Sequence, residues 1–149
     1  MNKLVIGVDP DADKHGIALY RNGELTDLKM LNLMGFIDLI DEFSNFDITV
    51  SIEDNNAVSA AYKARDKKGG NGHIKLKMAQ DIGKCKQAQI EIERACEKLG
   101  VKVVKYKQSK FWKSADTGKK QFERITGWTK RSNEDTRSAA YFGYLEAAK

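Results

Sequence analysis

Three acidic residues stand where apolar segments end or where a helical pattern begins. Asp9 and Glu53 each close an apolar run, and Asp135 lies at the start of the C-terminal helical segment. Carboxylate oxygens are the ligands that hard cations such as Mg²⁺ prefer. Two such ions about 3.5–4 Å apart can activate water on one side of a phosphodiester and stabilise the departing oxygen on the other. If the three side chains share one pocket, the sequence predicts a divalent-metal site suited to that chemistry.

Each of these acids also has a structural explanation on its own. Asp9 could cap a turn, Glu53 could lie on the surface, and Asp135 could stabilise the first turn of a helix through the helix dipole. For Asp135 alone the structural explanation is the stronger one, but for the three acids together we favour the metal site. Asp54 adjoins Glu53 and should point to the opposite face of a continuing strand, so it is a weaker candidate.

The elements that must position these acids alternate between strands and helices. The expected strands span residues 3–9, 15–20, 24–30, 48–53 and 101–106, and the expected helices span 35–43, 79–99, 109–113, 119–125 and 132–148. Asn22-Gly23 is a strong hairpin signal, which makes the start of the sheet antiparallel. A helix between the third and fourth strands implies a crossover to a parallel neighbour. We therefore expect an α/β fold with a five-stranded mixed sheet flanked by helices.

Length and composition limit the class of protein. The 149 residues, 41% of them hydrophobic, fit a single domain over residues 1–149. No stretch approaches the roughly 20 apolar residues of a membrane helix, and residues 1–3 run straight into a strand without an apolar signal region. We expect a soluble, cytoplasmic protein without a membrane partner. Cys85 and Cys96 lie about 16 Å apart along one predicted helix and cannot pair there, so both are expected to be reduced.

Charge is distributed unevenly along the chain. Residues 1–54 carry four basic against eleven acidic side chains, a net charge of −7, and residues 55–149 carry twenty-two against ten, a net charge of +12. An acidic pocket inside a basic surface suits a polyanion that brings a phosphate to a metal. A chain that is rich in lysine for solubility explains the charge equally well.

A basic, glycine-rich stretch follows the Glu53 strand, between Asn55 and Ala79, where the periodic pattern breaks down. We call residues 63–77 the basic segment. Its basic residues are Lys63, Arg65, Lys67, Lys68, Lys75 and Lys77, and its one acid is Asp66. The functional interpretation is a clamp on a nucleic-acid backbone, and the alternative is a solvated surface loop. Long loops without a role are uncommon in small domains, which favours the clamp.

Aromatic and basic residues also alternate in the C-terminal half. Lys110, Lys113 and Arg137 are candidate DNA contacts, and the neighbouring aromatics could stack on unpaired bases. Arg137 lies two positions from Asp135, hence on a different face of the helix, where it would meet a phosphate or a neighbouring acid. Trp112 and Trp128 are better explained as packing residues, since large aromatics are buried on average.

Several short segments, taken in order and spacing, carry a resemblance to a known family. They are Val5-Ile6-Gly7-Val8-Asp9-Pro10 with Gly16-Ile17-Ala18, Ser51-Ile52-Glu53-Asp54-Asn55-Asn56-Ala57, Gly83-Lys84-Cys85-Lys86-Gln87-Ala88, Lys110-Phe111-Trp112-Lys113, and Asn133-Glu134-Asp135-Thr136-Arg137-Ser138-Ala139-Ala140. In this order they resemble the RuvC-like Holliday junction resolvases of the RNase H-like superfamily, especially the small phage members, and the resemblance extends over nearly the whole chain. No single segment is specific by itself.

The resemblance implies an RNase H-like fold and a nuclease that cuts branched DNA, above all four-way junctions. It implies that Asp9, Glu53 and Asp135 are catalytic metal ligands for two Mg²⁺ ions, with Mn²⁺ as a substitute. It also implies a homodimer, because symmetric resolution of a junction needs two matched cuts, and the helix at 79–99 is our candidate interface. A phage-encoded member would act in the cytoplasm of its bacterial host.

The chain departs from the family pattern at two positions. Asp11 stands where a glycine usually follows the Asp-Pro pair, and Ser138 stands where the last helix often carries a second carboxylate. A hydroxyl is a weaker Mg²⁺ ligand than a carboxylate. Asp11, Glu134 and Ser138 are therefore additional metal-ligand candidates that, together with water, could complete the shell.

Three other functions compete with this hypothesis. A ribonuclease H-type enzyme would use the same fold and metals on RNA–DNA hybrids, although the basic segment favours a junction. A non-catalytic junction-binding protein is suggested by Ser138 in place of an acid. A sugar-kinase-like or actin-like nucleotide-binding domain also opens with an aspartate after a strand, but it needs two lobes, for which this chain is too short.

Overall fold

Five strands form one mixed sheet in the order β3-β2-β1-β4-β5 in the computed structural model, which describes residues 2–56 and 72–149. The strands are β1 (Lys3–Asp9), β2 (His15–Arg21), β3 (Glu24–Leu31), β4 (Asp47–Asp54) and β5 (Lys102–Lys107), and the helices are α1 (Leu33–Glu42), α3 (Gly72–Leu99), α4 (Thr117–Thr126) and α5 (Glu134–Ala147). The first three strands form an antiparallel meander, and β4 and β5 continue the sheet in parallel from β1. The predicted sheet is confirmed.

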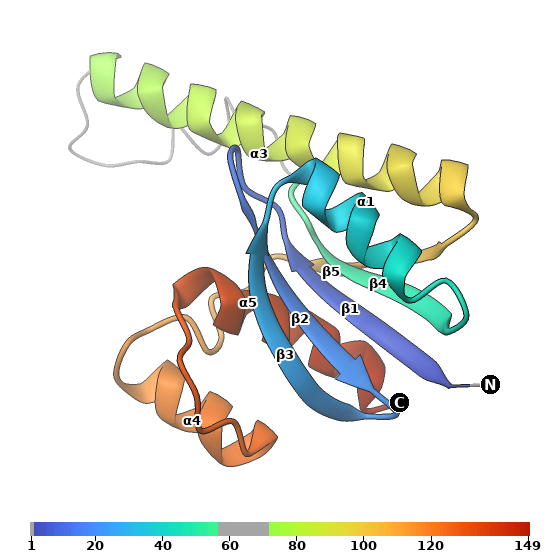
Figure 1. Cartoon of the computed structure of the whole chain (residues 1–149). Coiled ribbons are helices and arrows are strands. Elements are labelled where there is room, and N and C mark those ends of the chain that lie inside the picture. Colours follow the sequence, from blue (N-terminus) through green and yellow to red (C-terminus); the bar gives the residue numbers. More distant parts are fainter. Residues whose placement is uncertain (1, 57–71) are drawn as a thin grey trace.

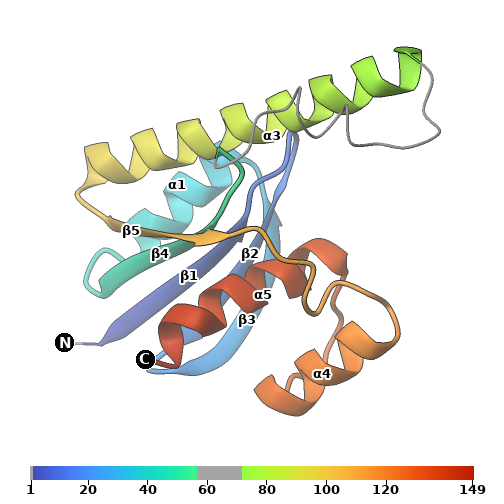
Figure 2. The same ribbon diagram turned by 180° about the vertical axis from the view of Figure 1, so that it is seen from behind.

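Alternation along the strands divides the core between the two faces of the sheet. Helices α1 and α3 cover one face, and α5 lies across the other with α4 beside it (Figures 1 and 2). In β1, Leu4, Ile6 and Val8 face the first layer, whereas Val5 packs against the second. The residues of β1 that alternate with this apolar row, Gly7 and Asp9, therefore belong to the face that α5 covers.

Glycine at position 7 lets α5 approach the sheet closely. A Cβ atom at Gly7 would overlap the carbonyl oxygen of Ala139 and crowd the backbone of Gly143 on the same helix. Two hydroxyls fasten the helix further: Tyr20 donates to the carbonyl oxygen of Ala140, and Ser51 donates to that of Phe142, each at 2.6 Å. Helix α5 therefore has a fixed height and register above the central strands.

The expected helices at 35–43 and 119–125 are observed as α1 and α4 with ends shifted by one or two residues, and the other three expected helices differ as follows. Helix α3 begins at Gly72 rather than at residue 79, so Lys75 and Lys77 of the basic segment are helical. The expected helix at 109–113 is wrong, because residues 111–113 form a turn in which Trp112 has φ +69°, a left-handed conformation that a helix cannot contain. Helix α5 begins at Glu134 rather than at 132, after an Asn133 cap.

Two further features of the described residues bear on the sequence expectations. Among the helices so described, none is long and apolar enough to span a membrane. Cys85 and Cys96 are free thiols on α3, as predicted, and Cys96 is fully buried in the core.

Candidate functional site

Asp9 and Glu53 occupy equivalent places on two neighbouring strands. Val8 of β1 and Ile52 of β4 are partners in the parallel pair, and each acid is the next residue of its strand. Adjacent strands lie about 4.8 Å apart, so both carboxylates emerge at the same end of the sheet on the α5 face. Both residues are buried, with exposed fractions of 6% and 7%. Two acids in such a position create a strong local negative potential.

The third acid comes from the first turn of α5. The Asn133 side chain accepts a hydrogen bond from the Thr136 backbone N–H, and the Asn133 backbone N–H donates to the Thr136 hydroxyl oxygen, which forms a capping box. Gly16 of β2 pairs with Asp9, and a Cβ atom on Gly16 would overlap the backbone carbonyl of Asp135. The lack of a side chain at Gly16 therefore lets Asp135 come down beside the strand ends.

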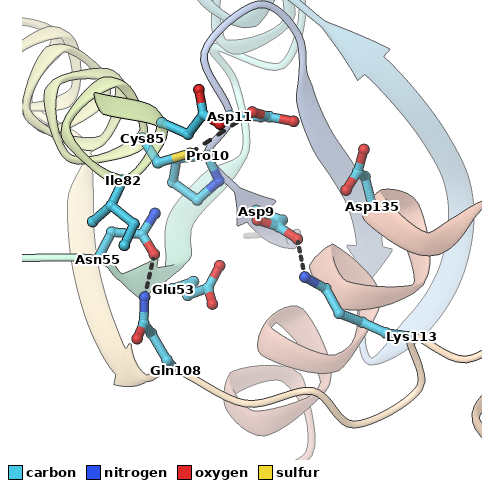
Figure 3. Close-up of a pocket in the computed structure, with 11 residues that line it drawn as sticks. Asp9, Pro10, Asp11, Glu53, Asn55, Ile82, Cys85, Gln108, Lys113 and Asp135 are labelled. Carbon is cyan, nitrogen blue, oxygen red and sulfur yellow. Dashed lines mark hydrogen bonds and ion pairs between the residues drawn. The ribbon is translucent and has the colours of Figure 1, made fainter. Parts of the chain in front are cut away.

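One pocket contains all three predicted acids (Figure 3). Its lining residues are Asp9, Pro10, Asp11, Glu53, Asn55, Asp81, Ile82, Cys85, Gln108, Lys113 and Asp135. Burial raises the pKa of Asp135, and the negative charges of Asp9 and Asp11 raise it further, opposed by Lys113. The site thus gathers acids that repel one another, an arrangement that favours a bound cation.

Lys113 reaches into this acidic pocket from the connection between β5 and α4. Its ammonium nitrogen lies 3.6 Å from Oδ2 of Asp9, the contact drawn in Figure 3. Burial acts to lower the pKa of Lys113, but the nearby carboxylates, Asp9 foremost and then Glu53, outweigh it, and the pKa is raised. Lys113 therefore stays charged at neutral pH and offsets part of the negative charge of the pocket.

The donor atoms of the pocket fit a hard divalent cation. Oδ2 of Asp9 is buried and accepts no hydrogen bond, since the Lys113 ammonium is at ion-pair rather than hydrogen-bond distance. Within residues 2–56 and 72–149, no three His, Cys, Asp or Glu side chains are arranged to hold an ion between them. A closed three-ligand cage is therefore absent from the described part. Mg²⁺ commonly takes only one or two carboxylates and completes its shell with water and substrate phosphate, which these residues can accommodate.

The additional metal-ligand candidates fall into two groups. Asp11 lines the pocket, whereas Glu134 and Ser138 do not. Ser138 is fully buried, and its hydroxyl has no hydrogen-bond partner. Asp54 points away from Glu53, as expected, and accepts a hydrogen bond from Gln89 on α3.

The candidate DNA contacts also separate in the structure. Arg137 is 5% exposed and donates to main-chain carbonyl oxygens and a hydroxyl, so the expected contact with a phosphate or an acid is wrong. Lys110 is exposed at the rim of the pocket, and Lys77 is exposed on α3. Lys63, Arg65, Lys67 and Lys68 lie outside the described residues, and for Lys75 the structure describes the backbone alone.

Several polar residues of the site were missed in the sequence. Gln108 is the first residue after β5, as Asn55 is the first after β4, and the Gln108 amide donates to Asn55 Oδ1 at 2.7 Å. Gln89 is fully buried on α3 and accepts the backbone N–H of Asn55 at 2.5 Å. The signal for Gln108 and Asn55 was available, because polar residues directly after parallel strands collect at one edge of the sheet.

Comparisons with known proteins identify the fold. No family model and no curated protein matches the chain. Among solved structures, RuvC of Thermus thermophilus matches with a TM-score of 0.60 at 12% identity, and the same protein in complex with a Holliday junction substrate matches with 0.58 at 14%. Each match covers 97% of this chain and 93% of the other. The chain therefore has the RuvC-type, RNase H-like fold that the sequence predicted.

Proposed function

We propose that this chain is a metal-dependent endonuclease that cuts branched DNA and resolves four-way junctions. The observation that carries the proposal is the pair of buried acids, Asp9 and Glu53, at the ends of adjacent parallel strands, with Asp135 of α5 lining the same pocket. The fold adds support, since a protein of the same fold was solved with a Holliday junction. Fold alone does not determine function, so the acids bear the main weight.

In this proposal the three acids hold one or two divalent ions. When bound, the metal would supply charge stabilisation at the cleaved phosphate and an activated water. The buried Oδ2 of Asp9, which accepts no hydrogen bond, would be the first ligand atom, and Glu53 of β4 and Asp135 of α5 would supply further oxygens. Lys113 supplies a fixed positive charge that can meet a phosphate oxygen entering the pocket.

Binding of DNA rests on basic residues around the acidic pocket. Lys110 lies at the rim beside Glu53 and Lys113. Phe111 is 60% exposed and packs on Tyr141 with a ring distance of 5.4 Å, so it can offer its free face to an unpaired base. Residues 55–149 carry a net charge of +12, which suits a phosphate backbone. The basic segment would extend this contact.

Symmetric resolution of a junction needs two active sites, so we propose a homodimer. Helix α3 is the candidate interface, because it projects beyond the sheet (Figure 1) and carries Leu76 and Leu99 with exposed fractions of 60% and 47%. Sedimentation at micromolar concentration would give twice the chain mass if the dimer forms, and a monomer at all concentrations would contradict it.

A second candidate is a junction-binding protein that does not cut. Lys113 among the acids and the missing three-ligand group in the described residues are the observations that favour it. Such a protein would bind junctions without need of a divalent cation, since Lys113 would neutralise the pocket permanently.

A substrate panel tests these candidates together. Purified protein is incubated with a labelled four-way junction, a linear duplex and an RNA–DNA hybrid, each with Mg²⁺, Mn²⁺ or EDTA. Paired, metal-dependent nicks confined to the junction are expected. Cleavage of the hybrid alone would favour a ribonuclease H-type enzyme. Tight binding of the junction without cleavage in either metal would favour the non-catalytic junction-binding protein.

A further inference from the structure

We propose that Arg137 is a positioning residue that fixes Lys113 in the acidic pocket. Arg137 lies on α5 two residues after Asp135, and Lys113 lies in the connection before α4. A single helix would then place both an acid of the pocket and the lysine that neutralises it. The inference rests on the proposed function for its catalytic consequence, but its structural part can be tested separately.

The guanidinium of Arg137 is bound to the turn that carries Lys113. Nε donates to the carbonyl oxygen of Trp112 at 2.9 Å, and Nη2 donates to the carbonyl oxygen of Lys113 at 2.7 Å. The remaining nitrogen, Nη1, donates to the hydroxyl of Ser132 at 3.0 Å. A guanidinium is planar and rigid, so two bonds to consecutive carbonyls set the direction of both peptide groups.

Arg137 is buried, and its hydrogen bonds go to main-chain carbonyl oxygens and a hydroxyl instead of a carboxylate. Arg137 is only 5% exposed, and none of the ion pairs formed by the described residues includes it. A buried charge without a carboxylate is costly unless hydrogen bonds replace its hydration. The carbonyl bonds supply that compensation, which ties the folded position of Arg137 to the conformation of the turn.

The turn itself has a conformation that needs support. Trp112 adopts φ +69°, which is unfavourable for a residue with a bulky side chain. Its indole ring packs against Phe122 and Tyr141 on one side, and the Arg137 bond holds its carbonyl on the other. Gly118 lies close against the same backbone. A Cβ atom at this position would lie 2.8 Å from the Trp112 carbonyl carbon, so the approach requires glycine. The main chain at Lys113 is therefore held from several directions.

This support determines where the Lys113 ammonium can go. From the fixed main chain the side chain extends to 3.6 Å from Asp9 and also lines the rim beside Glu53 and Lys110. Loss of the Arg137 bonds would free the turn to leave its left-handed conformation, and the ammonium would no longer be directed at Asp9. Misplacement by about 1 Å in an active site can reduce a rate by about a hundredfold.

The first test measures the position of Lys113 directly, without any reaction. The side-chain NH₃⁺ group of Lys113 is observed by ¹⁵N NMR and assigned by its loss in Lys113→Gln. In Arg137→Gln we expect this signal to move to the shift and fast water exchange of an exposed lysine. Ser132→Ala is the matched control, because it removes one partner of Arg137 and leaves both carbonyl bonds in place, and its signal should not move. An unchanged signal in Arg137→Gln would overturn the inference.

The second test asks whether Arg137 acts on cleavage through Lys113. Single-turnover rates are measured at saturating junction for wild type, Arg137→Gln, Lys113→Gln and the double variant, with the folded fraction checked by circular dichroism. We expect Arg137→Gln to lower the rate about tenfold to a hundredfold. In the Lys113→Gln background it should lower the rate less than about twofold, because the group it positions is already gone.

The outcomes separate this inference from the proposed function. Equal losses in both backgrounds would show a general structural role and overturn the positioning inference. If neither the wild type nor any variant cuts DNA, but the NMR signal of Lys113 still changes in Arg137→Gln, the proposed function is wrong and the positioning inference stands. If Arg137→Gln does not fold, Arg137→Lys is measured in the same way. The same displacement of the Lys113 signal is expected, because one ammonium group cannot orient two consecutive carbonyl groups as a guanidinium does.

Discussion

The ammonium of Lys113 lies 3.6 Å from a buried oxygen of Asp9, although the two residues are 104 positions apart in the sequence. The contact joins the end of β1 to the connection before α4 and sets a positive charge among the acids of the pocket (Figure 3). The folded protein therefore brings its own counter-ion, which limits repulsion between the carboxylates when no metal is bound.

The thiol of Cys85 should react slowly for a cysteine that lines a pocket. Burial raises its pKa to about 11, and the charge and hydrogen bond of Asp11 act in the same direction. Because the thiolate is the nucleophile, alkylation at pH 8 should be roughly a hundredfold slower than for an ordinary thiol. Iodoacetamide kinetics on Cys96→Ser, which isolates Cys85, measure this, and the rate should rise toward pH 11.

Asp11→Asn in the same background supplies the control for the cause. Removing the negative charge should lower the pKa of Cys85 and speed alkylation at pH 8. Fast labelling of Cys85 with Asp11 intact, at the rate of a free thiol, would contradict the geometry of the pocket.

His15 should take up its proton only at a lower pH than an ordinary histidine does, because its pKa is lowered. It is 4% exposed, and its Nδ1 accepts the backbone N–H of Asp11 at 3.1 Å, which a protonated Nδ1 cannot do. Burial lowers its pKa below 6.5, although Asp11, Asp9 and Glu91 oppose the shift. The unfolded chain takes up this proton near pH 6.5 and the folded chain does not, so the contribution to stability is lost as pH falls below 6.5.

A proton NMR titration of the two histidines checks this prediction. His73→Gln leaves His15 as the remaining signal, and its midpoint should lie below 6.5. His15→Asn keeps an acceptor that does not titrate, so its melting temperature should fall less between pH 7 and pH 5 than that of wild type. A His15 midpoint at or above 6.5 would disprove the neutral acceptor.

Two glycines should respond to alanine in opposite directions. At Gly7 a methyl group would overlap the carbonyl oxygen of Ala139, so Gly7→Ala should lower the free energy of unfolding by about 3 kcal/mol. At Gly83, on α3, nothing lies within 4 Å of the added atom, and Gly83→Ala should raise it by about 0.5–1 kcal/mol. Urea unfolding measures both, and a neutral Gly7→Ala would show that α5 does not rest on β1.

The sequence was sufficient to predict the sheet and the meeting of three acids in one pocket, whereas the role of these acids stays a prediction. Strand-ending carboxylates follow from the two-residue period of a strand, and a parallel pair brings Asp9 and Glu53 to one edge regardless of other details. Asp135 was selected by its place near the start of the C-terminal helical pattern and by the resemblance to the last helix of the family. These features depend on local patterns, which tertiary contacts did not change.

The features that could not be predicted depend on contacts between distant residues. Near the start of α3, even the apolar side chain of Leu76 is exposed. The sequence there therefore lacks the apolar stripe by which a helix is recognised. The turn at Trp112 has no local signal, because its left-handed conformation is supported by Arg137 from another element. The separation of Arg137 from Asp135 on α5 was correct, but its partners are carbonyl oxygens that no residue type reveals.

The basic segment should contribute to the salt dependence of DNA binding. Lys67→Gln/Lys68→Gln should reduce the slope of log K against log salt by about 0.9 for each phosphate that the variant no longer neutralises. Lys3→Gln/Lys102→Gln removes the same charge at the opposite end of β1 and β5 from the pocket, and should leave the slope unchanged. Fluorescence anisotropy with a labelled junction in EDTA gives both slopes. Equal reductions in the two variants would show a general charge effect only.

Cleavage by Asp9→Asn tests the central claim most directly. The wild-type chain, Asp9→Asn and the exposed α1 control Asp41→Asn are compared on one labelled four-way junction with Mg²⁺. We expect paired nicks from wild type and from Asp41→Asn, and a decrease of at least about a hundredfold in Asp9→Asn with junction binding retained. Undiminished cleavage by Asp9→Asn would contradict an active site built on the acids at the ends of β1 and β4.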